Sequence, residues 1–237
     1  MRRVPGGADP PLRLIEVNVS GSSQARMPPA HPPLMLSAID LECIRGTRRL
    51  FAGVSFVLEP GECLFLQGPN GSGKTSLLRI LCGLARPERG EVRWNAEPIA
   101  ALTEDYRAAL AYCGHANALK DDLRPSENLL AAAALAGRPA SVKQARAALE
   151  ALGVAQLDAL PVRALSQGQK RRVALARLVL AQCPLWILDE PLTSLDARAA
   201  ETLAGLVDAH LARGGIAVLT SHQPIELRAE IRVFVFA

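Results

Sequence analysis

Residues Gly68 to Thr75 carry the residue types and the spacing needed to hold a triphosphate. They read GPNGSGKT, that is Gly68, Pro69, Asn70, Gly71, Ser72, Gly73, Lys74 and Thr75. Glycines let the backbone turn its N–H groups toward phosphate oxygens, and the start of a helix adds favourable partial charge. We expect Lys74 to reach the β- and γ-phosphates and the Thr75 hydroxyl to bind Mg²⁺. The segment therefore predicts a site for ATP with Mg²⁺.

Two carboxylates, Asp189 and Glu190, end a second apolar run that reads LWILDE. Ligands of open α/β sheets bind beyond the carboxyl ends of the strands, so we expect Asp189 to reach the Mg²⁺ shell through water. Glu190 is then the candidate general base for the attacking water, a role that typically contributes about 10²–10⁴-fold. The alternative interpretation, a solvated turn at a strand end, is disfavoured because a phosphate-binding segment precedes the pair.

Short β-like runs alternate with helical ones, which is typical of an α/β sandwich. Runs such as CLFL and LWIL are apolar at successive positions, so both sheet faces are expected to be covered, as in a mostly parallel sheet. An Ala-rich, mostly helical stretch at about 116–165 predicts an inserted helical lobe. The expected strands are 36–43, 63–66, 91–94, 110–113, 185–188, 216–220 and 232–236. The expected helices are 75–82, 127–136, 142–152, 168–181 and 197–212.

Length and composition limit the classes of protein. A chain of 237 residues predicts one domain with a small inserted lobe. Its longest apolar stretch is far shorter than the roughly 18–20 residues that span a bilayer, so any membrane role is expected to come through partners. The net charge of +4 is scattered among acidic residues and only nine residues are aromatic, which disfavours a nucleic-acid partner.

The first residues differ in composition from the rest. Residues 1–34 hold seven prolines and little periodicity, which predicts a disordered extension, or an upstream start codon ahead of Met27 or Met35. The folded domain is expected at 35–237. The cysteines form no C-x-x-C pair and are expected to be buried reduced thiols, with a metal site as the alternative. They are Cys43, Cys63, Cys82, Cys113 and Cys183.

A third motif, LSQGQ, precedes the helical run KRRVALARLVLA. It resembles the signature of ABC ATPases, usually LSGGQ, with Gln167 in place of a glycine. From about Met35 onward the chain resembles this family in the order of its motifs. The resemblance implies a P-loop NTPase of the ABC ATPase type: an α/β fold with a mostly parallel core sheet, an inserted helical lobe and an antiparallel β portion.

The family resemblance also assigns expected roles. Small residues at a helix start make a second phosphate-binding surface, which in the family completes the ATP site of a second copy, so a dimer is required. His222 is expected to sense the γ-phosphate. The alternative interpretations are an ordinary N-cap for Ser166 and a surface histidine for His222. The signature residues are Ser166, Gln167, Gly168 and Gln169, and the D-loop residues are Ser194 and Asp196.

Two sites in the sequence depart from the usual pattern of ABC ATPases and help to indicate which subfamily the chain resembles. His115 stands where most relatives have a glutamine, and Arg45 and Gly46 stand where relatives carry an aromatic that stacks on adenine. Adenine would then meet an arginine plane or be held loosely. The stretches YCGHANALKDDLRPSENL, LWILDEPLTSLD and GGIAVLTSHQP resemble the ATP-binding subunit of the haem exporter of cytochrome c maturation, the CcmA family.

That resemblance implies a haem-transporting ATPase subunit, peripheral on the cytoplasmic face of the bacterial inner membrane. Its integral membrane partners would couple ATP hydrolysis to release of a haem-loaded chaperone. The first alternative is the ATPase of another ABC exporter, for a drug or a lipid, which genomic neighbours would distinguish. The second alternative is a soluble ABC ATPase that acts on ribosomes or DNA. Such proteins usually carry two ATPase domains or a long coiled-coil insertion in one chain, and neither is evident in these 237 residues. A small-metabolite kinase is disfavoured by LSQGQ and SLD.

Overall fold

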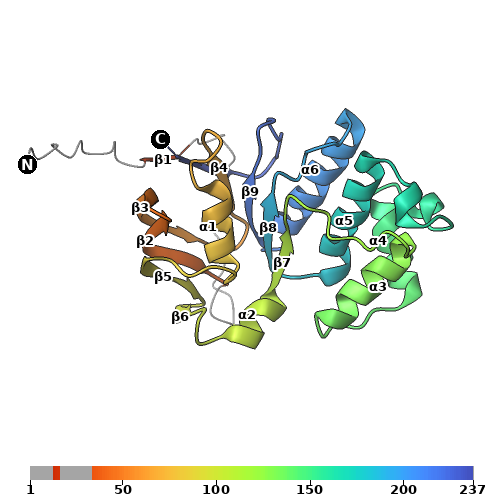
Figure 1. Cartoon of the computed structure of the whole chain (residues 1–237), viewed down its shortest axis with the longest axis horizontal. Helices are drawn as coiled ribbons and strands as arrows, with labels where there is room; N and C mark the ends of the chain where they lie inside the picture. The colour runs from red at the N-terminus through yellow and green to blue at the C-terminus, as the bar shows by residue number, and fades with distance from the viewer. Residues whose placement is uncertain (1–12, 17–33, 237) are drawn as a thin grey trace, which may run out of the picture.

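The computed structural model describes residues 13–16 and 34–236. A six-stranded sheet has the order β1-β10-β4-β9-β8-β7, in which the β1–β10 pair is antiparallel and every other pair is parallel. The carboxyl ends of the parallel strands therefore meet at one edge (Figure 1). The strands are β1 (Arg13–Glu16), β4 (Cys63–Gln67), β7 (Leu110–Cys113), β8 (Leu185–Asp189), β9 (Ile216–Thr220) and β10 (Ile231–Val235).

A second sheet is antiparallel, with the order β3-β2-β5-β6. Its strands are β2 (Leu36–Arg45), β3 (Arg48–Leu58), β5 (Arg89–Trp94) and β6 (Glu97–Pro98). The two sheets confirm the predicted fold class of a mostly parallel core with an antiparallel portion. Strand β3 was not anticipated, because its buried residues Phe51, Val54 and Phe56 break the spacing of two. Register shifts against β2 account for that break, since a bulge inserts an extra residue.

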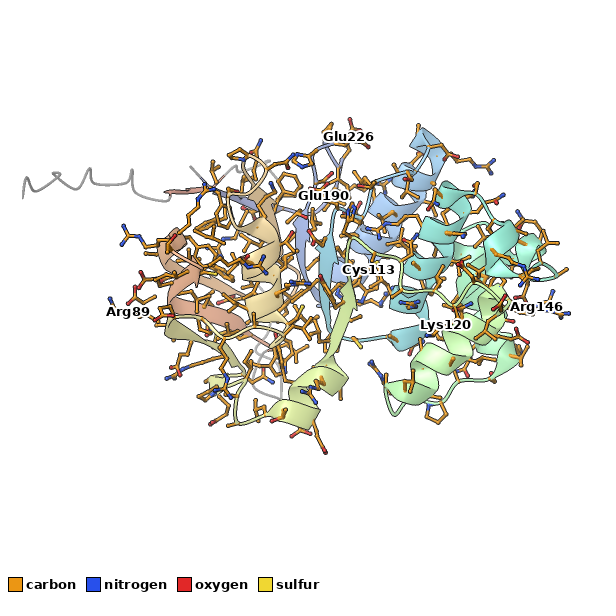
Figure 2. All side chains as sticks on the ribbon, viewed as in Figure 1. Arg89, Cys113, Lys120, Arg146, Glu190 and Glu226 are labelled. Carbon is orange, nitrogen blue, oxygen red and sulfur yellow. The ribbon has the colours of Figure 1, made fainter. Side chains whose placement is uncertain are left out.

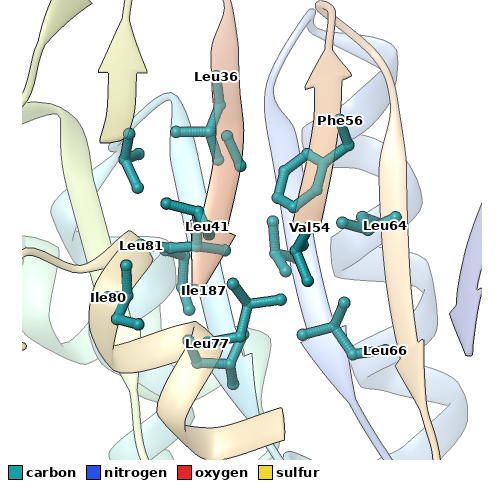
Figure 3. Packing of buried hydrophobic residues seen from close by; sticks show 14 of the residues in the cluster. Leu36, Leu41, Val54, Phe56, Leu64, Leu66, Leu77, Ile80, Leu81 and Ile187 are labelled. Carbon is teal, nitrogen blue, oxygen red and sulfur yellow. The ribbon is translucent and has the colours of Figure 1, made fainter. Parts of the chain in front are cut away.

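Helices cover both faces of the parallel sheet. The helix α1 (Lys74–Leu81) lies between the two sheets, where Leu77 and Leu81 pack against β2, β3, β4 and β8 (Figure 3). On the other face, α5 (Gln167–Ala181) and α6 (Ala197–Ala212) pack on Trp186 and Leu188. Strands β8 and β9 are buried at every position, because alternate residues face the two layers.

The chain between β7 and β8 forms a helical lobe beside the sheet (Figure 1). It contains α3 (Pro125–Leu135), α4 (Val142–Ala151) and the short 3₁₀ turns Ala155–Leu157 and Val162–Ala164. The expected helix at 127–136 begins earlier, at Pro125, because proline suits the first helical turn. A further short helix, α2 (Thr103–Ala109), was not anticipated from the sequence.

The expected disordered extension is only partly within the described residues. Arg13–Glu16 forms β1 and pairs with β10 in register Arg13↔Val235, so these four residues depart from the expectation. The β-branched Ile15 favours a strand locally, and the strand forms here because the edge of β10 offers unpaired backbone groups. The rest of the predicted extension, residues 1–12 and 17–33, lies outside the described residues.

The five cysteines are free and buried. Burial raises the pKa of the Cys63 thiol to about 12, so the thiol form prevails at neutral pH. In the described part of the chain, no three His, Cys, Asp or Glu side chains group as a metal site would require. The same residues contain no helix with the length and apolar character needed to cross a bilayer.

Candidate functional site: a cleft at the ends of the parallel strands

The glycine-rich segment forms a tight loop between β4 and α1. Gly73, the residue that precedes α1, has φ 109°, a conformation that side chains rarely adopt. A Cβ at Gly73 would lie 2.9 Å from Phe51 of β3, and one at Gly68 would lie 2.7 Å from the Phe236 Cβ. Glycine is required at both positions because the loop is pressed against the antiparallel sheet and the end of β10.

Lys74 lies inside this loop with 8% of its surface exposed. Its Nζ donates to the carbonyl oxygens of Gly68 at 2.7 Å and Pro69 at 3.0 Å. These bonds hold the ammonium against the loop that sequence analysis assigned to the phosphates. A positive charge fixed among inward-facing backbone groups forms a cradle suited to an anion.

Asp189 lies opposite the loop, at the end of β8. Its Oδ1 accepts a hydrogen bond from the Thr75 hydroxyl at 3.3 Å and from the Thr220 hydroxyl at 2.9 Å. The carboxylate is 3% exposed. Hydroxyl and carboxylate oxygens are the ligands that Mg²⁺ prefers, and Mg²⁺ usually takes one or two of them together with phosphate oxygens and water. The two predicted Mg²⁺ residues, Thr75 and Asp189, therefore fit that ion.

Glu190 has an unusual backbone conformation. Its φ of 51° is left-handed, which costs a non-glycine residue on the order of 1–3 kcal/mol. The Glu190 N–H donates to the Thr220 Oγ1 at 2.9 Å. The carboxylate accepts from the His222 N–H at 3.1 Å, and the His222 Nε2 lies 3.4 Å from Glu190 Oε1. Glu190 stands at the ends of the parallel strands, near the centre of the molecule (Figure 2).

The phosphate loop and the Glu190–His222 pair line one cleft of about 490 Å³. The base candidate Glu190, the histidines His115 and His222, and the loop residues Lys74 and Thr75 all line it. Arg45, the residue that stands in place of the usual aromatic, lines the cleft together with Leu50 of β3. The structure thus brings together side chains that the sequence spreads over most of its length.

Thr220 was not singled out from the sequence, although it connects Asp189 to Glu190. It is completely buried and ends the otherwise apolar run IAVLT. Its position could have indicated a role in the site. A buried hydroxyl needs hydrogen-bond partners, and Thr220 stands at the carboxyl end of a strand, the edge where the site is expected.

The signature residues lie elsewhere. Within the described chain, none of Ser166 to Gln169 lines the cleft that contains Lys74. Ser166 caps α5 and forms a capping box with Gln169. A Cβ at Gly168 would lie 2.7 Å from the Ser194 carbonyl oxygen, so the start of α5 touches the D-loop closely. Asp196 caps α6 by accepting the Ala199 N–H at 2.8 Å.

Comparison with known proteins gives this arrangement a family. The family model described as ABC transporter matches residues 51–193, more than half of the chain. The cytochrome c biogenesis ATP-binding export protein CcmA of Dechloromonas aromatica (strain RCB) is 57% identical over 195 residues, which cover 82% of this chain and 96% of that protein. The chain belongs to the CcmA family of ABC transporter proteins. The resemblance noted from the sequence is thereby confirmed.

Solved structures share this fold. A structure described as the ATP binding subunit of an ABC transporter has a TM-score of 0.71 and 29% identity, covering 79% of this chain and 80% of that one. A dimeric ATP-binding cassette, in a post-hydrolysis state with ADP and Pi, has a TM-score of 0.70 and 24% identity, covering 79% and 88%. As a CcmA family member, the chain is an ABC-type ATPase subunit that binds ATP.

Proposed function

We propose that the chain hydrolyses MgATP in this cleft as the ATPase subunit of a haem exporter in cytochrome c biogenesis. The observation that carries the proposal is one cleft lined by a lysine-containing phosphate loop and a glutamate–histidine pair, with buried Asp189 bonded to Thr75 of that lining. A phosphate cradle, a magnesium ligand set and a base are what phosphoryl transfer to water requires.

Each side chain has a task in this reaction. Gly68 to Thr75 bind the triphosphate through backbone N–H groups, and Lys74 pairs with the β- and γ-phosphates. Thr75 and Asp189 hold Mg²⁺, which neutralises phosphate charge when bound. Glu190 accepts the proton of the attacking water, and His222 orients Glu190 and contacts the γ-phosphate. His115, which stands where most relatives have a glutamine, contacts Mg²⁺-bound water or relays motion to the membrane partners.

A second copy completes the site in this proposal. Ser166 to Gln169 present small residues, a hydroxyl and a helix N-terminus on a surface away from their own cleft, which suits an anion held by another subunit. Ser194 and Asp196 lie beside this surface and belong to the same interface. The dimeric cassette with ADP and Pi is a precedent for such an assembly in a protein of the same fold.

The remaining parts of the proposal concern partners and location. The name of the Dechloromonas relative as an export protein of cytochrome c biogenesis supports integral membrane partners of that system. The chain would then be peripheral on the cytoplasmic face of the bacterial inner membrane, without a nucleic-acid partner. The residues 1–34 are proposed as an extension outside the 35–237 ATPase domain, whose helical lobe is about 116–165.

The substitution Glu190→Gln tests the hydrolytic site. It keeps the side-chain shape and removes the base, so we expect turnover to fall by about 10²–10⁴-fold. MgATP should still bind and should trap an ATP-bound dimer, measured by size-exclusion chromatography with ATP. The matched control is Lys74→Ala, which should prevent ATP binding and therefore give no dimer. If the Glu190→Gln variant hydrolysed ATP at the wild-type rate, Glu190 would not be the general base.

The exporter assignment needs a cellular readout. In a bacterium that lacks its own CcmA gene, the wild-type chain should restore c-type cytochromes, measured by haem staining of denatured membrane proteins. The Glu190→Gln variant, expressed at the same level, should not restore them. Full restoration by Glu190→Gln, or none by an active wild-type chain, would contradict a role for its ATPase activity in cytochrome biogenesis.

A further inference from the structure

Arg171 of α5 is a buried charge whose hydrogen bonds, within the described chain, go to carbonyl and amide oxygens and not to a carboxylate. It is 3% exposed, although it lies little more than one turn from the signature serine, Ser166. All five N–H groups of a guanidinium have an acceptor here. Nε donates to the Pro191 oxygen at 3.2 Å, Nη1 to the Gly114 oxygen at 2.8 Å and Asn117 Oδ1 at 3.3 Å, and Nη2 to the oxygens of Asp189 at 3.0 Å and Glu190 at 2.8 Å.

These bonds join three separate segments. The first is α5 itself, which carries the signature at its start. The second is the loop after β7, where Gly114 and Asn117 flank His115. The third is the backbone from Asp189 to Pro191, at the end of β8. Only arginine supplies five donors in a fixed plane, whereas lysine supplies three from one point, so the residue type matches the number of acceptors.

The hydrogen bond from Arg171 to the Glu190 carbonyl oxygen helps to fix the backbone conformation of Glu190. Glu190 has a left-handed backbone conformation that does not persist without support from its surroundings. Thr220 binds its N–H and Arg171 binds its carbonyl oxygen, so the backbone is held on both sides. The carboxylate direction follows from this backbone conformation, because a change in φ swings the side chain away from His222.

We propose that Arg171 is a positioning residue that holds Glu190 in the orientation needed for hydrolysis and fixes it to the signature helix. The proposal rests on the function proposed above for Glu190. It adds that the surface offered to a second copy and the base in the chain's own cleft move as one body, since the same guanidinium holds both elements. Loss of Arg171 should therefore slow the chemical step more than it weakens ATP binding.

The test replaces Arg171 by lysine in the full chain, with Arg177→Lys as the matched control. Arg177 also lies on α5 and also donates to a carbonyl of the loop after β7, that of Ala118, but in the described part of the chain it makes no hydrogen bond to Glu190. We expect Arg171→Lys to lower kcat by about 10–100-fold, the effect of a misplaced catalytic group, with KM for ATP within about twofold of wild type. Arg177→Lys should keep both constants within about twofold.

A second readout separates positioning from a general structural defect. If only the chemical step is slow, Arg171→Lys should accumulate an ATP-bound dimer on size-exclusion chromatography, as Glu190→Gln does. The neutral variant Arg171→Gln should give the same result. A wild-type kcat in Arg171→Lys, equal losses in Arg171→Lys and Arg177→Lys, or loss of ATP binding in both Arg171 variants would overturn the proposal.

The same experiments distinguish this inference from the proposed function. Hydrolysis at the wild-type rate by Glu190→Gln would refute the proposed function and the inference with it. A trapped dimer in Glu190→Gln, together with wild-type kcat in Arg171→Lys, would refute the inference alone.

Discussion

At the residue scale, the cleft depends on polar atoms that are shared between distant segments. The Thr220 hydroxyl donates to Asp189 and accepts from the Glu190 N–H, so one oxygen organises both carboxylate residues. Thr75 of α1 donates to the same Asp189 oxygen. A buried polar atom that loses its partner pays its full desolvation cost, so such sharing makes the site sensitive to single atoms.

The substitution Thr220→Val tests this dependence. Valine has the shape of threonine, but it leaves the Glu190 N–H without its acceptor and removes one of the two hydroxyl donors to the Asp189 oxygen, the other being Thr75. We expect the free energy of unfolding to fall by about 1–3 kcal/mol and ATP turnover to fall with it. Urea denaturation and a phosphate-release assay measure the two effects. Thr220→Ser keeps the hydroxyl and should retain most of the turnover; equal turnover in the valine and serine variants would show that the hydroxyl is not needed.

At the element scale, two helices begin with the same local device. Ser166 caps α5 with Gln169, and Ser141 caps α4 with Gln144. Each serine hydroxyl accepts a backbone N–H at 3.3 Å. The two capping boxes share this pair of bonds, and the Ser141 hydroxyl also donates to Gln144 Oε1 at 2.8 Å, so a purely local role would make Ser141 at least as important as Ser166. They differ in that α5 also carries Arg171 and touches the D-loop through Gly168.

Paired substitutions separate capping from partner binding. Ser141→Ala and Ser166→Ala should each lower the free energy of unfolding by about 0.5–2 kcal/mol, the usual cost of a lost N-cap. Only Ser166→Ala should strongly reduce ATP turnover, because its hydroxyl is proposed to meet the triphosphate of the second copy. Thermal unfolding and a steady-state ATPase assay measure both. Equal turnover in the two variants would show that Ser166 acts only as a helix N-cap and does not contact the triphosphate of the second copy.

At the scale of the whole molecule, the core contains a titratable group in the layer between α6 and the sheet. The His210 ring stacks on Trp186 at 4.0 Å between centroids and lies 3.2 Å from the Ile216 oxygen through Nε2. A Cβ at Gly215 would lie 2.3 Å from this ring, so the turn before β9 requires glycine. Burial lowers the pKa of His210 below its usual 6.5, because the charged form is poorly solvated there.

This histidine predicts a pH dependence of stability. Below about pH 6.5 the unfolded chain binds a proton at residue 210 while the folded chain still excludes it, so the free energy of unfolding falls as pH falls through that window. His210→Gln cannot titrate, and its free energy of unfolding should therefore fall less between pH 7.5 and 5.5. Urea denaturation at several pH values provides the comparison. Parallel pH curves for the two proteins would exclude His210 as the cause.

Much of the site was predictable from the sequence because its motifs are local. The loop from Gly68 to Thr75 needs only its own glycines, its lysine and a strand–helix junction, all of which adjoin one another. Asp189 and Glu190 end an apolar run. Such runs also predicted the parallel strands, because a strand covered on both faces has apolar residues at successive positions. Short-range chemistry and periodicity therefore indicated the fold class and the cleft.

Tertiary structure alone decided the contacts between distant segments. The bulged strand β3 and the pairing of β1 with β10 depend on partners that no local pattern specifies. The sharing of the Thr220 hydroxyl and the five bonds of Arg171 likewise depend on which strand ends meet at one edge. The physical reason is that a hydrogen bond needs its donor and acceptor within about 3 Å of each other. A polar group at a strand end therefore bonds to whichever groups the folded chain places beside it, and distance along the sequence does not indicate which groups these are.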